Sequence, residues 1–235
     1  MEHILNAIST SARVVADSLQ QTSYQGKSRL TTIEVTFPRF VLAEFNTHRM
    51  LSRNSASSRA IPVWKRLYEV ATSPFVPLHF GKNKAGMEFT EVVSAEDNES
   101  ARHNWLVGRD TALIQAFALA GGHDEIISTS KGDDRAEYVC NYVDLICRKY
   151  YRDVFGVMRG LSSPVHKQHA NRVLEPYAWH TVIVTSTYWR NFYALRASKH
   201  AQPEAREFAI AMAKAHMASI PKELQNEKWH LPYIQ

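Results

Sequence analysis

The segment from residue 48 to residue 59 holds the side chains whose types and spacing best suit chemistry. It reads His-Arg-Met-Leu-Ser-Arg-Asn-Ser-Ala-Ser-Ser-Arg, so an imidazole and a guanidinium precede a Ser/Asn-rich stretch that ends in Arg59. Arginine forks that flank hydroxyls and exposed backbone N–H groups bind phosphate well. The segment therefore predicts an anion-binding site, and the alternative is a surface loop with capping residues.

The basic residues of the chain are clustered. The formal net charge is +5, and residues 45–68 contain five Lys and Arg with no Asp or Glu, while residues 154–203 contain six against Glu175 alone. Both clusters also hold Ser, Asn, His and aromatic residues, which favours a pocket for a phosphorylated small molecule over an extended nucleic-acid surface. Solvated charged faces are the alternative.

Length and composition limit the classes of protein. The chain has 235 residues, of which 45% are hydrophobic and 22% charged, as in an average soluble globular domain. No linker or repeat divides it, so we expect one domain over residues 1–235. No apolar run approaches the roughly 18 to 20 residues of a membrane span and no signal-peptide pattern is visible, so we expect a cytoplasmic protein without a membrane partner. Two cysteines allow neither a disulfide framework nor a Cys-rich zinc cluster, and we expect no metal.

Two strands and a short helix are expected to position the first basic segment. Residues 12–19 and 30–37 read as strands, the second with apolar and polar residues in alternation. Pro38 suits the first turn of a helix, and at helical spacing Glu44 and His48 then share one face.

The rest of the chain predicts mostly helices, giving an α/β (α+β) fold with a few-stranded sheet and long helices. Residues 50–61 are expected to form an irregular loop, because Ser and Asn side chains compete for backbone hydrogen bonds. Residues 74–92 read as an extended connection and 179–187 as a strand. Cys140 and Cys147 are expected in or near a buried helical stripe, without a catalytic role. Helices are expected from Pro62 through Ala71, from Ser94 to Gly121, from Asp134 to Met158, over 165–174, from Trp189 to Arg196 and from Pro203 onward.

Three motifs resemble those of the flavin-dependent thymidylate synthases. The spacing H-R-x-x-S-x-N-x-x-S-x-R from His48 to Arg59 matches their signature R-H-R-x-x-S-x-N-x-x-S-x-R except at its first position. Asn191-Phe192-x-x-Leu195-Arg196 followed by Ala201-Gln202-x-Glu204 resembles a second block of that family, and Ala170 to Leu174 with Pro176 is similar to its A-R-x-V-L-P. These matches follow the order of the family and coincide with the two basic clusters.

The resemblance implies a reaction and its participants. The family forms homotetramers with active sites at subunit interfaces, and it binds FAD and a pyrimidine deoxynucleotide monophosphate. NADPH reduces the flavin, and methylenetetrahydrofolate gives the one-carbon unit that converts deoxyuridine monophosphate (dUMP) to thymidylate (dTMP). No protein nucleophile is required, since the cofactor carries the difficult chemistry.

The resemblance also assigns roles to residues of this chain. Ser57 and Arg59 would hold the nucleotide phosphate, joined by either Asn171 or Arg172. Arg196 would face the pyrimidine and act catalytically by stabilising negative charge on the base, and an interfacial salt bridge is its alternative role. The residues expected to bind substrate are Glu44, Ser57, Arg59, Asn171, Arg172 and Arg196. Those expected to bind FAD are His48, Arg49, Asn54 and Asn191, and a plain helix-end position is the alternative for His48.

Three positions depart from the family pattern. Thr47 stands at its first Arg, Glu44 where Gln is common and Ser55 where Glu is frequent, and the family's H-x-x-P-F-E-H segment is missing before the first helix. This divergent form resembles bacteriophage-encoded members, which places the expected location in a host cytoplasm. Changed charges alter how an anion binds, so a flavin-dependent methylase or hydroxymethylase of another pyrimidine deoxynucleotide, such as deoxycytidylate (dCMP), is the second candidate. A nucleic-acid-binding module and an inactive family member are the third and fourth candidates, and we expect no nucleic-acid partner.

Overall fold

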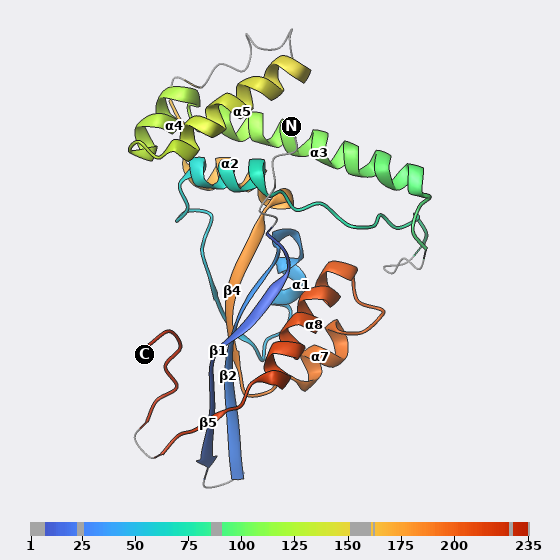
Figure 1. The fold of residues 1–235 in the computed structure, drawn as a ribbon, viewed down its shortest axis with the longest axis vertical. Helices are drawn as coiled ribbons and strands as arrows, with labels where there is room; N and C mark the ends of the chain where they lie inside the picture. Colours follow the sequence, from blue (N-terminus) through green and yellow to red (C-terminus); the bar gives the residue numbers. More distant parts are fainter. Residues whose placement is uncertain are drawn as a thin grey trace. The chain divides into compact units, whose positions relative to one another are not determined.

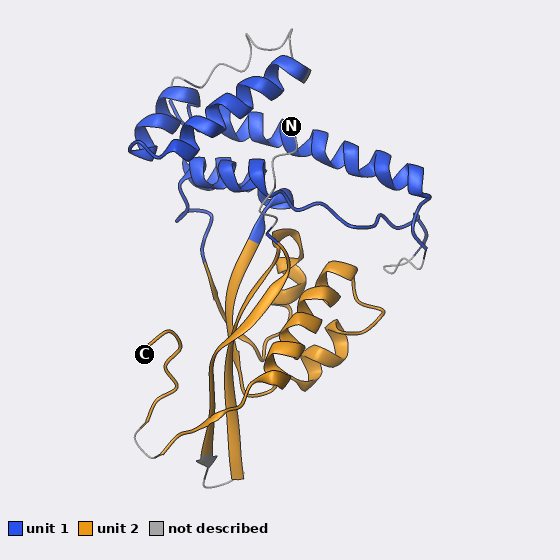
Figure 2. Ribbon diagram, in the orientation of Figure 1, with its two compact units in different colours: residues 1–8, 56–179 blue, residues 9–55, 180–235 orange. Residues whose placement is uncertain are grey.

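The computed structural model describes residues 8–22, 26–85, 91–150, 161, 163–225 and 228–234. The chain divides into two compact units, of which unit 1 comprises residues 1–8 and 56–179 and unit 2 comprises residues 9–55 and 180–235 (Figure 2). Helices and a five-stranded sheet are both present, so the predicted mixed fold class is confirmed. The expectation of a single domain over the whole chain stays a prediction.

Unit 2 is built on a sheet with the strand order β3-β4-β2-β1-β5. Strands β1 and β2 form a long antiparallel hairpin, and β5 pairs with β1 in parallel. The strands predicted at 12–19, 30–37 and 179–187 are all present, the first two extended toward the connecting turn. The bounds are Ser11–Thr22 for β1, Gly26–Pro38 for β2, Ser52–Ser55 for β3, Trp179–Ser186 for β4 and Lys222–Glu223 for β5.

The prediction of an irregular loop over residues 50–61 is wrong for its first half. Residues 52–55 form strand β3, which pairs antiparallel with β4 so that Arg53 lies opposite Val184. Ser and Asn have low strand propensity, but β4 is rich in β-branched residues and offers its edge as a partner. Tertiary pairing therefore overrides the local preference of this segment.

The helix predicted after Pro38 is shorter than expected. A 3₁₀ turn over Arg39–Val41 leads into α1 (Leu42–Asn46), which ends before His48. The Thr47 backbone N–H and hydroxyl both donate to the Glu44 carbonyl, at 3.2 and 2.7 Å, and these bonds close the last turn of the helix. Glu44 and His48 therefore do not share the face of one helix.

Two helices and the sheet enclose the core of unit 2. Figure 1 shows α7 (Arg190–Arg196) and α8 (Pro203–Ala218) side by side against the sheet. Both helices were predicted, and Pro203 opens α8 as expected. Burying each large apolar side chain stabilises the unit by roughly 1.5–3 kcal/mol. The core side chains include Ile33, Val35, Phe37, Phe45, Val182, Val184, Phe192, Phe208 and Met212.

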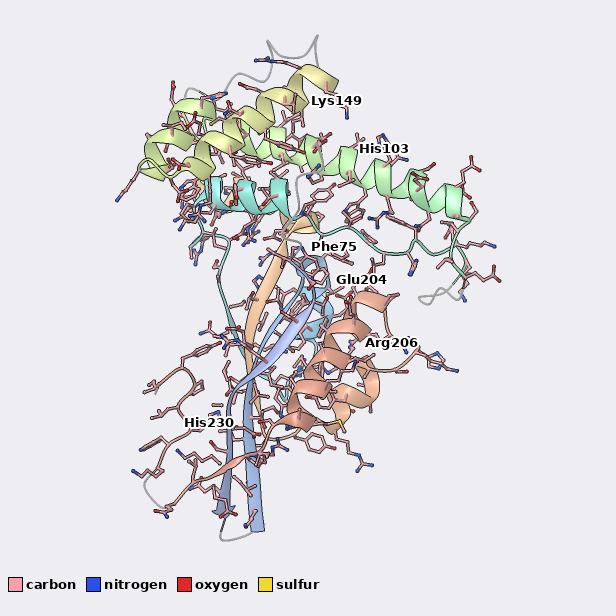
Figure 3. The ribbon with its side chains drawn as sticks, viewed as in Figure 1. Phe75, His103, Lys149, Glu204, Arg206 and His230 are labelled. Carbon is pink, nitrogen blue, oxygen red and sulfur yellow. The ribbon has the colours of Figure 1, made fainter. Side chains whose placement is uncertain are left out.

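The C-terminal segment lies against the hairpin of unit 2. The two ring nitrogens of His230 contact the hydroxyls of Ser18 at 2.8 Å and Thr32 at 2.7 Å, and Figure 3 shows His230 beside the strands. Their strand neighbours Asp17 and Thr31 share a hydrogen bond, and Thr31 also contacts His216 of α8. Because side chains alternate along a strand, the C-terminal segment covers the sheet face opposite α8.

Unit 1 is helical. Ser94 caps α3 as predicted, with its hydroxyl accepting from the backbone N–H of Asp97 at 3.1 Å. The helix expected from Asp134 to Met158 begins as predicted, and its predicted end lies outside the described residues. No helix occurs in the described part of residues 74–92, in line with the expected connection. The bounds are Val63–Thr72 for α2, Ala95–Leu119 for α3, Gly122–Ser130 for α4, Asp134–Tyr150 for α5 and Lys167–Val173 for α6, with a 3₁₀ turn at Glu175–Tyr177.

Helix α4 was not predicted, because the pair Gly121-Gly122 was interpreted only as a helix end. Gly121 adopts a φ of 97°, which a residue with a side chain rarely tolerates, and this turn starts a new helix directly after α3.

The two cysteines lie in the core of unit 1, as expected from their spacing. Cys140 and Cys147 on α5 are 3% and 7% exposed. Burial raises the pKa of the Cys140 thiol to about 11 and also raises the pKa of Cys147. Neither thiol is poised to form a reactive thiolate near neutral pH.

Candidate functional site

A cleft of about 310 Å³ in unit 2 joins two segments that are distant in sequence. One follows α1 and the other surrounds α7. Four residues expected at the active site, His48, Arg49, Asn191 and Arg196, line this single cleft. The complete lining is Thr47, His48, Arg49, Met50, Tyr188, Asn191, Phe192, Leu195 and Arg196.

Arg196 is held by two neighbours in the cleft. Its Nε donates to Nε2 of His48 at 2.8 Å, and its Nη2 donates to the Thr47 hydroxyl at 3.3 Å. Burial and the nearby guanidiniums of Arg196 and Arg53 lower the pKa of His48. The imidazole is therefore neutral at pH 7 and serves as an acceptor, while Arg196 keeps the positive charge.

Arg53 fixes the backbone that carries His48. One guanidinium nitrogen of Arg53 donates to the carbonyls of Phe45 at 2.9 Å and His48 at 2.8 Å, and the guanidinium lies over the Phe45 ring. It thus satisfies carbonyls at and just beyond the end of α1. Sequence reasoning did not assign this role to Arg53, although a cation closely following a short helix is a recognised sign of such a cap.

The start of α7 is tied to the same backbone. The Ser186 hydroxyl donates to the Met50 carbonyl at 3.0 Å, and the Trp189 indole donates to the Ser186 carbonyl at 3.1 Å. The Phe192 ring meets the His48 ring edge-on, with centroids 5.0 Å apart. These contacts connect the two walls of the cleft through packed and hydrogen-bonded groups.

The rim of the cleft is apolar, which sequence reasoning missed. Met50, Tyr188 and Leu195 are 65%, 48% and 55% exposed. Together with the polar groups of His48 and Arg196, they form a lining suited to a flat ring that has polar atoms at its edge. Met50, at an x position of the first motif, and Leu195, a fixed letter of the second, were the available signal, whereas Tyr188 lies outside both motifs.

Two predicted site residues of unit 2 lie outside this lining. Asn54 is exposed on β3, opposite Ile183 of β4. Glu44 is half-buried on α1, and its Oε2 has no hydrogen-bond partner within the described part of the chain. The expected role of Asn54 on FAD and that of Glu44 on substrate stay predictions.

Unit 1 contains the other predicted substrate residues. Asn171 on α6 is 1% exposed, and its side-chain amide donates to the carbonyls of Ser58 and Ile61, both at 2.8 Å. The amide thus fixes the backbone of the loop that presents Arg59. Arg172 follows Asn171 and is exposed. The two alternatives for the phosphate therefore differ, because Asn171 is buried with its amide already hydrogen-bonded to the backbone, whereas Arg172 is accessible to a ligand.

The loop itself presents Ser57 and Arg59. The backbone N–H of Arg59 donates to the Ser57 hydroxyl at 3.3 Å, and both side chains are exposed. Arg59 belongs to unit 1 and Arg196 to unit 2, so their expected convergence on one nucleotide stays a prediction.

Metal-binding and membrane-spanning features are not seen in the described ranges. In them, no group of three or more His, Cys, Asp or Glu is arranged to hold a metal ion. None of the helices within these ranges is both long and apolar enough to cross a bilayer.

Comparisons with known proteins assign a family. The fold is similar to a crystal structure of the UMP/dUMP methylase PolB from Streptomyces cacaoi bound with 5-Br UMP, at a TM-score of 0.52 and 14% identity, covering 89% of this chain and 93% of that chain. A second structure of that methylase, bound with 5-Br dUMP, has 15% identity and a TM-score of 0.48 over 80% of this chain and 66% of that chain. No curated protein sequence matches. The family described as Thymidylate synthase complementing protein matches residues 29–222. The chain therefore belongs to the thymidylate synthase complementing protein family.

Proposed function

We propose that this protein is a flavin-dependent thymidylate synthase that converts dUMP to dTMP. FAD is the proposed cofactor, methylenetetrahydrofolate the carbon donor and NADPH the reductant. Family membership supports an enzyme that methylates a pyrimidine nucleotide. The observation that carries the proposal is the presence of His48, Arg49, Asn191 and Arg196 in one cleft.

The cleft lining fits a flavin ring. Met50, Tyr188 and Leu195 offer apolar surface, while Arg49 and Asn191 offer donors for the polar edge of a planar ring. When bound, the flavin supplies the electrons that reduce the transferred carbon unit. Because a cleft of about 310 Å³ holds only part of a dinucleotide, neighbouring subunits of the proposed homotetramer would supply further contacts.

The residues of the chain would provide charge and orientation. Arg196, fixed by neutral His48, would place a cation against the pyrimidine and stabilise negative charge as it develops there. Because that cation is held before substrate arrives, little reorganisation is needed during the reaction. Ser57 and Arg59 would hold the phosphate, with Arg172 as the accessible second cation.

A second candidate is a methylase or hydroxymethylase of another pyrimidine nucleotide. Thr47 lines the cleft where the family pattern has Arg, and its hydroxyl accepts from Arg196 instead of adding a second positive charge. A missing cation changes how an anionic nucleotide or the FAD diphosphate binds. PolB, described as a UMP/dUMP methylase, supports the general class of nucleotide monophosphate substrates.

One experiment separates these candidates. The purified protein is examined for flavin absorbance and then incubated with NADPH, methylenetetrahydrofolate and dUMP, UMP or dCMP in parallel, with products identified by mass spectrometry. We expect bound flavin and a methyl group added to dUMP. Modification of dCMP alone would favour the second candidate, and a protein that binds neither FAD nor a nucleotide would refute both. The Arg196→Ala variant is the inactive control.

A further inference from the structure

Tyr193 connects helix α7, which lines the cleft, to helix α8. It lies on α7 between the cleft residues Asn191 and Arg196, yet it is not part of the lining. Its ring stacks on Trp189 with centroids 5.8 Å apart and planes 13° apart, and its hydroxyl lies 3.3 Å from Nδ1 of His216. The side of α7 that faces away from the cleft is therefore anchored to α8.

The hydrogen bond between Tyr193 and His216 continues into the sheet through Thr31 to Asp17, and each group in this chain donates to the next. Nε2 of His216 lies 3.2 Å from the Thr31 hydroxyl, which donates to Oδ1 of Asp17 at 3.0 Å. A carboxylate only accepts, so the Thr31 proton points to Asp17 and its oxygen accepts from His216. His216 then carries its proton on Nε2 and leaves Nδ1 to accept from Tyr193.

Arg29 closes this network at its charged end. Its Nε and Nη2 donate to the two carboxylate oxygens of Asp17 at 2.9 and 2.6 Å, and Nη2 also donates to the carbonyls of His216 and Ser219 at 3.0 Å. Arg29 thus pairs Asp17 and caps the end of α8. Burial raises the pKa of Tyr193, and burial together with Arg29 lowers the pKa of His216, which keeps both groups neutral.

From this geometry we infer that His216 is a positioning residue for the active-site cleft, acting through Tyr193 on α7. Helix α7 has seven residues, too few to hold its shape or rotation without tertiary anchors. Phe192 anchors it in the core, and the Tyr193 hydroxyl fixes its rotation. Loss of that bond lets α7 shift, which disturbs the 2.8 Å contact between Arg196 and His48.

The kinetic test rests on the proposed function and uses conservative variants. Tyr193→Phe removes one hydroxyl and His216→Phe removes both ring nitrogens, while each keeps an aromatic ring. We expect each to lower kcat about tenfold with little change in the nucleotide KM, because a small misplacement of a catalytic group costs turnover. The double variant is expected to be no worse than the more impaired single variant, since both act through one contact.

Rescue and control variants separate positioning from general damage. His216→Gln retains an acceptor and a donor and is expected to recover part of the lost kcat. Tyr138→Phe on α5 of unit 1 is the matched control, expected to leave kcat unchanged. Additive losses in the double variant, or full kcat in folded Tyr193→Phe protein, would overturn the inference.

A measurement without turnover keeps the two proposals distinguishable. Nitrogen-15 NMR of the full chain at pH 7 is expected to show neutral His216 protonated on Nε2, and the Nε resonance of Arg196 is expected to shift in Tyr193→Phe protein. A neutral His216 protonated on Nδ1, or an unmoved Arg196 resonance, counts against the positioning role. If the wild-type protein shows the His216 signal and the Tyr193→Phe protein shows the Arg196 shift, but the wild-type protein binds no FAD or nucleotide, the proposed function fails and the structural link stands.

Discussion

The arginine side chain in the cleft of unit 2, Arg196, and the one in the Ser57–Arg59 loop of unit 1, Arg59, are constrained to different degrees. In the cleft, the Arg196 side chain is itself held, because His48 and Thr47 both accept from it. In the loop, Asn171 holds the backbone, while the Arg59 side chain is exposed and makes no hydrogen bond within the described part of the chain. A held cation suits transition-state stabilisation, whereas an exposed one must lose side-chain entropy when a ligand binds. Changes in the cleft should therefore reduce turnover, and changes in the loop should weaken binding.

Arg196→Ala tests the first half of this contrast. We expect turnover to fall by at least ~100-fold, because a preorganised cation is lost from the cleft. Little core volume is removed, so the circular dichroism spectrum and the melting temperature should stay close to those of the wild type. Product formation measured by mass spectrometry gives the answer, and near-normal turnover in folded protein would refute the catalytic role.

Asn171→Ala tests whether backbone anchoring matters in the loop. The two carbonyls at Ser58 and Ile61 lose their donor, so the free energy of unfolding should fall by about 1–3 kcal/mol. Chemical denaturation measures this loss. Asn104→Ala, an exposed position on α3, is the matched control and should change stability by less than about 0.5 kcal/mol. Equal losses in both variants would contradict the anchoring role.

Arg59→Lys keeps the charge of the loop but removes the planar fork. We expect nucleotide binding to weaken about tenfold, while turnover at saturating nucleotide changes little, since a point ammonium does not reproduce bidentate contacts. Titration calorimetry with dUMP measures the affinity. A large fall in saturated turnover with unchanged affinity would reverse the assignment of binding to the loop and chemistry to the cleft.

The pH dependence of stability extends the contrast to the neutral histidines of unit 2. The pKa values of His48 and His216 are lowered in the folded protein, so the unfolded chain binds more protons once the pH falls below about 6.5. The free energy of unfolding should therefore decline as the pH drops from about 6.5 toward 5. In the His216→Phe variant that decline should be shallower than in the wild type, as measured by urea unfolding at each pH. An unchanged slope would contradict the neutral state of half-buried His216 in the folded protein.

The sequence predicts elements whose local signals agree with their surroundings. Alternation over residues 30–37 and the Ser94 cap were sufficient for β2 and the start of α3. The end of α1 was mispredicted because the local contacts of Arg53 with the carbonyls of His48 and Phe45, five and eight residues before it, were not recognised. Strand β3 was mispredicted because it depends on pairing with β4, which lies outside any local window of sequence.

The residues of the candidate site that could be predicted were those that occupy fixed positions of the family motifs. His48, Asn191 and Arg196 were named from the resemblance and share one cleft. The apolar rim and the link between Tyr193 and His216 were not predicted, because residue spacing does not reveal which side chains from separate elements become neighbours.

The burial of both native thiols has a practical consequence. Because Cys140 and Cys147 lie within the helical core with raised pKa values, a maleimide reagent at neutral pH should leave them largely unmodified. A single cysteine introduced at exposed Trp229 could then carry a fluorophore on the C-terminal segment while the wild-type core is retained.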